Sequence, residues 1–127
     1  MTSLSTTVLF HEGGPQPDHY DWLFEDPDGG EKLVCFRVDR PPGRWRSGER
    51  IRLDALAPHR PCYLTYEGPL SGGRGTVQLI ERGRLHVQRW EWDRAEMRMQ
   101  TEAFSGRVVL TGGGGGKWTM EVVEASA

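Results

Sequence analysis

Long apolar runs and cysteine are scarce in this chain of 127 residues, and each scarcity excludes a class of protein. Mean hydropathy is −0.60, and no apolar run approaches the roughly 18 residues that a membrane-spanning helix needs. The first residues carry neither a basic segment nor a long apolar one, so we expect no secretion signal, no membrane partner and a cytoplasmic protein. Cys35 and Cys62 cannot build a disulfide framework, and we expect both to be reduced in apolar surroundings.

Charge is unevenly distributed although its net value is only −2. Residues 1–40 hold eight acidic and three basic residues, whereas residues 41–127 hold ten acidic and thirteen basic ones. Lysine supplies two of the 16 basic residues and arginine the other 14. Arginine is the better bidentate partner for phosphate, but a GC-rich genome produces the same bias, so both explanations stay open.

Glycine and proline are plentiful, with 17 and eight residues, and they separate short β-rich runs. We expect strands over residues 6–10, 19–25, 32–38, 49–53, 62–67, 75–81, 84–92, 96–104, 106–111 and 117–123. Arg82 and Gly83 indicate a tight hairpin between two of them, and residues 54–57 are the only stretch that could form a helical turn. The recurrence of short strands predicts an all-β fold. Short strands in an open sheet leave costly edges, which closure into a barrel removes. Residues 1–127 would form one compact antiparallel β-barrel of about eight to ten short strands with little helix.

Alternation within the expected strands assigns side chains to faces. Tyr20, Trp22 and Phe24 point one way, and His19, Asp21 and Leu23 point the other. The glycine run at residues 112–116 precedes a lysine but lacks the strand-to-helix spacing of a phosphate-binding loop. It is expected to be a hairpin tip.

The triplet His19-Tyr20-Asp21 places an imidazole and a carboxylate on one side of a strand, about 7 Å apart along the chain. These two groups can ligate one divalent metal ion, and a third ligand is available from the other histidines: His11, His59 and His86. A solvated strand face is the plain alternative. His19, Asp21 and His59 also match in outline the iron triad of barrel oxygenases, although no Arg-x-Ser follows about ten residues after His59.

Arginines gather between residues 40 and 60: Arg40, Arg44, Arg46, Arg50, Arg52 and Arg60. Beside a metal ion they would suit a phosphate ester, since the cation polarises one oxygen and guanidinium groups neutralise the others. A solvated basic loop is the alternative. Residues 59–69 follow, with a histidine at the start, aromatic residues and a glycine-rich turn. There His59 could serve as a general acid or a phosphate contact.

Taken in order, these segments resemble the 3′-phosphoesterase domain of bacterial DNA ligase D and its small stand-alone relatives. The family's first motif corresponds to His11 followed by residues 19–25, and its second to an apolar strand that runs into residues 39–42. Its third motif corresponds to His59, Tyr63 and residues 66–68, followed by a Gly-Thr-Val strand. The resemblance covers residues 8–123.

The resemblance implies a β-barrel with a crescent-shaped surface groove. It implies an Mn²⁺-dependent (or other divalent-metal) phosphoesterase that removes a 3′-ribonucleoside and then the 3′-phosphate in DNA repair by end joining. Its partners would be nucleic-acid 3′ ends, DNA or DNA/RNA primer-templates, and end-joining ligase or polymerase proteins. The implied metal ligands are His11, His19 and Asp21, and the implied catalytic residues are His59, Tyr63, Arg40, Arg50 and Arg52.

Two departures from the family pattern leave further hypotheses open. The family's arginine two residues after the aspartate is Leu23 here, and His11 stands eight residues before His19 where the family usually has six. The leucine motivates a catalytically weakened relative that binds nucleic-acid ends or a repair partner. The third hypothesis is the barrel oxygenase with iron held by His19, Asp21 and His59.

Overall fold

Strand-forming runs separated by glycine and proline produce nine β-strands in the computed structural model, which describes residues 2–112 and 114–126. The strands are β1 (Thr2–Glu12), β2 (His19–Phe24), β3 (Leu33–Val38), β4 (Arg50–His59), β5 (Gly68–Pro69), β6 (Thr76–Trp90), β7 (Arg94–Thr101), β8 (Ser105–Gly112) and β9 (Lys117–Ser126). Three short 3₁₀ helices complete the described chain: η1 (Pro42–Arg44), η2 (Pro61–Leu64) and η3 (Ser71–Gly73). None of these helices has the length and apolar character to cross a membrane.

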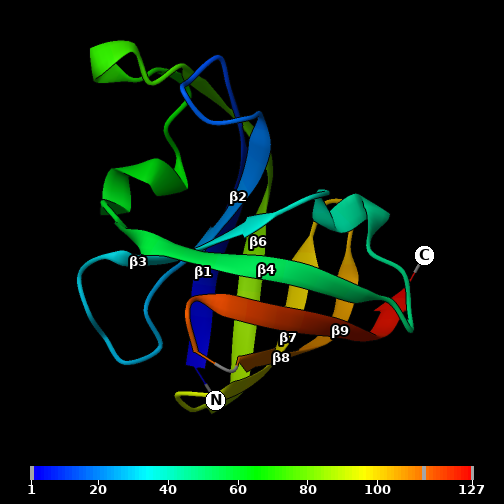
Figure 1. Ribbon diagram of the computed structural model, residues 1–127. Coiled ribbons are helices and arrows are strands. Elements are labelled where there is room, and N and C mark those ends of the chain that lie inside the picture. The colour runs from blue at the N-terminus through cyan, green and yellow to red at the C-terminus, as the bar shows by residue number, and fades with distance from the viewer. Residues whose placement is uncertain (1, 113, 127) are drawn as a thin grey trace.

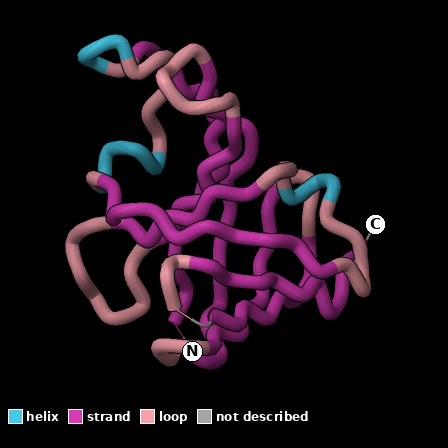
Figure 2. Tube along the Cα trace, in the orientation of Figure 1, coloured by secondary structure: helices cyan, strands magenta, loops and turns pink. Residues whose placement is uncertain are grey.

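Eight of the strands close into an antiparallel barrel (Figures 1 and 2). Their order is β1-β2-β3-β4-β9-β8-β7-β6, and β6 pairs back onto β1, so the sheet has no free edge along this circuit. The two-residue β5 adds to β6 alone. The expected all-β barrel with little helix is therefore confirmed.

The barrel interior is filled by apolar side chains from every strand of the circuit. Trp22 is fully buried at its centre, and its ring meets that of Trp45 edge-on with centroids 5.4 Å apart. The indole Nε1–H of Trp22 donates to Thr6 Oγ1 over 2.9 Å, so burying this ring leaves no polar group unpaired. This large aromatic core holds the strand register rigid.

A second, smaller apolar cluster lies on the outer face of β1, β2, β3 and β6. Its buried members are Leu9, Leu23, Leu33, Cys35 and Val77. The segment from η2 to β5 covers it with Tyr63, Leu64, Tyr66 and Leu70. In Figure 1 this green segment lies outside the barrel wall. The alternation expected for β2 is confirmed, but both of its faces are buried, because a covering segment shields the outer one.

Several local expectations were wrong. Residues 62–67 were expected to form a strand, but most of them lie in η2 and the turn after it, and only Gly68–Pro69 pair with β6. Residues 54–57 belong to β4 rather than to a helical turn. The expected hairpin at Arg82-Gly83 is absent, since residues 76–90 form the single strand β6. A Cβ at Gly83 would lie 1.8 Å from the Gln100 carbonyl oxygen, so this glycine permits close strand approach rather than a turn.

Candidate metal centre

Three metal-ligating side chains meet on the outer face of the barrel, where β1 ends and β2 begins. His11 and His19 are directly opposed in the β1–β2 register, and their ring centroids lie 4.9 Å apart. Asp21 follows two residues after His19 and points to the same face. Because β2 is flanked by β1 and β3 and covered by η2, the Asp21 residue is only 4% exposed. The strand pairing thus gathers the three implied metal ligands, His11, His19 and Asp21, around one buried carboxylate.

The distances among the ligand atoms are short. His19 Nε2 lies 3.1 Å from Asp21 Oδ1, and His11 Nδ1 lies 3.8 Å from Asp21 Oδ2. All three ligand atoms lie within 4.8 Å of one another. Asp21 Oδ1 is buried and accepts no hydrogen bond from the described residues. An unpaired buried carboxylate oxygen is costly, and a bound cation would supply its missing partner.

Backbone carbonyls fix the other nitrogen of each ring. His11 Nε2 lies 2.6 Å from the Arg74 carbonyl oxygen, and His19 Nδ1 lies 2.8 Å from that of Pro17. A carbonyl oxygen only accepts, so these ring nitrogens carry the protons. In each neutral ring the remaining nitrogen then presents a lone pair toward Asp21. Histidines that bind metals are held in this way, with the second ring nitrogen donating to a carbonyl or carboxylate.

Glycines bring the Arg74 carbonyl to His11. Gly75 has φ +87°, and a Cβ there would lie 2.1 Å from the Glu12 carbonyl oxygen. A Cβ at Gly14 would lie 2.6 Å from the Arg74 carbonyl oxygen. Only glycine lets the chain after β1 and the chain before β6 approach this closely. Gly14 and Gly75 therefore allow the Arg74 carbonyl to reach His11.

His59 and Cys35 approach the same carboxylate from β4 and β3. Ligand atoms of Asp21, Cys35 and His59 form a second group within 4.8 Å of one another. His59 Nδ1 lies 2.8 Å from the Ala57 carbonyl oxygen, so its Nε2 also carries a lone pair. The His59 ring packs edge-on against Tyr63, with centroids 5.8 Å apart. Cys35 is buried, as expected, whereas Cys62 is exposed, contrary to expectation.

Burial governs the electrostatics of this centre. It raises the pKa of Asp21, against the opposing effect of His19, His59, His11 and Arg37. Burial also strongly raises the pKa of the Cys35 thiol, and the nearby Asp21 raises it further. A negative charge is therefore expensive here unless a cation accompanies it.

The structure does not bring the predicted arginines together around the centre. The Arg40 guanidinium lies 3.0 Å from Asp39 and 2.8 Å from Glu49, and the hydrogen bond to Asp39 raises its pKa. Arg50 and Arg52 are exposed on β4. Of these three, Arg52 lines a pocket of about 340 Å³ that also contains His19.

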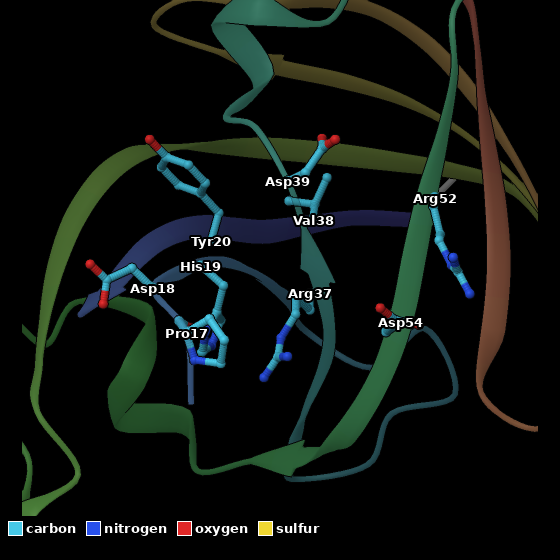
Figure 3. Close-up of a pocket in the computed structure, with 9 residues that line it drawn as sticks. All are labelled: Pro17, Asp18, His19, Tyr20, Arg37, Val38, Asp39, Arg52 and Asp54. Carbon is cyan, nitrogen blue, oxygen red and sulfur yellow. Dashed lines mark hydrogen bonds between the residues drawn. The ribbon is translucent and has the colours of Figure 1, made fainter. Parts of the chain in front are cut away.

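Arg37 is the functional candidate that sequence reasoning missed. It pairs with Asp21 in the β2–β3 register and lines the same pocket as His19 (Figure 3). The figure shows its side chain on the His19 side of the sheet, whereas Tyr20 points to the opposite side. Alternation within residues 32–38 places Arg37 on the same face as Cys35, but pairing it with Asp21 required the strand register.

The comparisons overturn the ligase D identification. No family model matches the chain. A curated relative, beta-crystallin B3 of Bos taurus, is 31% identical over 86 residues, which is 67% of this chain. The chain spans 39% of that relative's length. This similarity is to a crystallin and not to a phosphoesterase or a repair enzyme.

The functional hypotheses drawn from the sequence are therefore wrong. The phosphoesterase, its weakened relative and their place in end joining depended on the ligase D resemblance, which the crystallin match contradicts. The oxygenase alternative gains no support from it either. The structure also explains the departure at position 23, since Leu23 is fully buried in the outer apolar cluster, where a guanidinium would have no water. The comparisons thus show a chain similar to beta-crystallin B3 over two thirds of its length.

Proposed function

We propose that this protein binds a divalent transition-metal ion on the outer face of its barrel through three ligands, His11, His19 and Asp21. One observation carries the proposal. The rings of His11 and His19 each have one nitrogen held by a backbone carbonyl, and the other nitrogen of each ring faces the buried carboxylate of Asp21. This arrangement matches the way proteins orient histidines for a metal.

Protonated histidines would be the main alternative partners for Asp21. One carboxylate cannot balance the imidazolium rings of both His11 and His19, and Asp21 Oδ1 receives no hydrogen bond from the described residues despite His19 Nε2 at 3.1 Å. Two lone pairs facing each other repel, whereas a cation between them would be attracted to both. A metal ion therefore accounts for the geometry better than an ion-pair network does.

The donor set favours first-row divalent ions. Imidazole suits zinc, copper, iron and nickel, and carboxylate broadens the range toward manganese. By the usual affinity order, Zn²⁺ and Co²⁺ should bind more tightly than the Mn²⁺ that the ligase D resemblance implied. A thiophilic ion could also draw in Cys35, whose thiol would release its proton to solvent as the sulfur–metal bond forms.

Equilibrium dialysis of the chelator-treated protein against Zn²⁺, Co²⁺ and Mn²⁺, with metal analysis, tests the proposal. We expect one ion per chain, and His19→Ala should weaken binding by at least about a hundredfold because it removes a direct ligand. His86→Ala on β6 is the matched control and should change nothing. Equal metal content in wild type, His19→Ala and His11→Ala would overturn the proposal.

We also place the protein in the cytoplasm, supported by two cysteines that stay free. The partners expected from the sequence, nucleic-acid 3′ ends and end-joining proteins, stay untested predictions. The metal-site proposal does not depend on them.

A further inference from the structure

Arg37 carries a charge without a partner. Among the described residues its side chain forms no hydrogen bond or ion pair, and its Nε is buried and unpartnered. Its two register neighbours are acidic, Asp21 on β2 and Asp54 on β4. Asp54 instead lies 2.9 Å from Lys117 Nζ, and this hydrogen bond lowers the pKa of Asp54. A buried guanidinium nitrogen without a protein partner calls for a ligand or ordered water.

Asp21 does not satisfy Arg37, although the two residues are directly opposed. Both oxygens of Asp21 face the histidines, at 3.1 Å from His19 and 3.8 Å from His11. Two unpaired buried atoms of opposite charge, Asp21 Oδ1 and Arg37 Nε, therefore lie on adjacent strands without pairing. The carboxylate of Asp21 can therefore bind a cation, and the guanidinium of Arg37 can bind an anion.

A pocket reaches from His19 to Arg37, although Asp21 itself does not line it. It has a volume of about 340 Å³ and is lined by both His19 and Arg37. Pockets that take small ligands begin at about 300 Å³. An anion held by Arg37 would consequently lie beside a metal held by His19, and three protein ligands leave coordination positions open for it.

We infer that this pocket binds a small organic carboxylate, one oxygen on the Arg37 guanidinium and the other at an open position of the metal. The metal contact rests on the proposed function. A planar carboxylate matches the guanidinium fork. Asp39 and Asp54 also line the pocket but are paired with Arg40 and Lys117, and Arg52 adds a second positive charge to the lining. Asp18, which forms no ion pair among the described residues, would repel a phosphate dianion more strongly than a carboxylate monoanion.

The test titrates acetate, propionate and inorganic phosphate into metal-free and Co²⁺-loaded protein at constant ionic strength. The NMR signal of Arg37 Nε–H reports the contact in the metal-free form, and the cobalt absorption spectrum reports it in the loaded form. Arg37→Gln should weaken carboxylate binding at least about tenfold without changing metal content. Arg37→Lys keeps the charge and should recover part of that loss. Arg98→Gln is the matched control, because the exposed Arg98 of β7 pairs with Glu124 of β9, and this variant should bind carboxylates as wild type does.

The outcomes separate this inference from the metal proposal. If cobalt binds but acetate and propionate do not, or bind equally to Arg37→Gln and Arg98→Gln, the inference fails while the metal site stands. If no metal binds but carboxylates still shift the Arg37 signal, the metal proposal fails and the Arg37 contact stands. Tighter, Arg37-dependent binding of phosphate would overturn the assignment to carboxylates.

Discussion

His19 Nε2 and Asp21 Oδ1 lie 3.1 Å apart with no hydrogen bond between them, and the other ring nitrogen of His19 lies 2.8 Å from the Pro17 carbonyl oxygen. With a neutral His19 ring protonated at Nδ1, the pair places two lone pairs face to face in a buried setting. Such a contact is unfavourable in the metal-free protein and becomes favourable once a cation lies between the atoms. This contact motivates the metal site that we propose on the outer face of β2.

Displacing the Arg74 carbonyl should weaken metal binding without removing any ligand. Gly75→Ala would put a Cβ against the Glu12 carbonyl at a φ of +87° and move the backbone that holds His11. We expect about a tenfold loss of Zn²⁺ affinity, measured by competition with a chromophoric chelator. Gly72→Ala is the control, since Gly72 also has a positive φ, +71°, but no atom lies within 4 Å of its added Cβ. Equal losses in both variants would show that general backbone strain, not His11 orientation, is responsible.

Asp21→Asn should stabilise the metal-free protein at neutral pH. Burial raises the pKa of Asp21 above its ordinary 3.8, so the native state loses stability as pH rises from that value through the native pKa. The neutral amide removes this cost and can donate to His19. We expect a gain of about 1–3 kcal/mol at pH 7 in urea unfolding.

The same comparison at lower pH and with metal checks the cause. The advantage of Asp21→Asn should shrink on acidification and vanish below about pH 3.8, where both states hold the proton. With Zn²⁺ in hundredfold excess over its Kd, wild type should gain about 2.7 kcal/mol and the variant far less. A pH-independent difference would point to packing instead of charge.

Cobalt should report whether Cys35 joins the centre. Its sulfur lies within 4.8 Å of ligand atoms of Asp21 and His59, so a bound Co²⁺ can take it as a thiolate. We expect a thiolate-to-cobalt charge-transfer band in wild type that disappears in Cys35→Ser. The exposed Cys62→Ser serves as control and should keep the band. A wild-type spectrum without this band would restrict the ligands to nitrogen and oxygen.

Leu23→Arg should destabilise the barrel severely. Leu23 is fully buried between β2 and the covering segment, and a guanidinium there would have neither water nor a partner. We expect a loss of about 3 kcal/mol or more of unfolding free energy. Leu23→Met conserves volume and should cost less than about 1.5 kcal/mol. If Leu23→Arg had the same unfolding free energy as Leu23→Met, the segment from η2 to β5 that covers the outer cluster would have to open readily.

Much of the barrel could be predicted because period-2 alternation is a local property. Trp22 and Leu23 were assigned correctly to opposite faces from their neighbours alone. Predictions failed where contacts between residues far apart in the sequence decide the local structure. Gly83 looked like a turn residue, but β7 approaches it too closely for a side chain. Residues 62–67 have strand-forming composition, yet they cover the outer cluster as η2 and a turn.

For the candidate site too, some features could be predicted from the sequence and others could not. The sequence by itself determined that His19 and Asp21 share a strand face, because successive side chains alternate at a fixed period. Only the tertiary structure decided that His11 faces His19, that carbonyls of Pro17 and Arg74 orient both rings, and that Arg37 stands opposite Asp21. Those relationships depend on strand register and on backbone contacts between residues as far apart as 11 and 74. Register follows from how the whole barrel closes around its aromatic core, which no local pattern records.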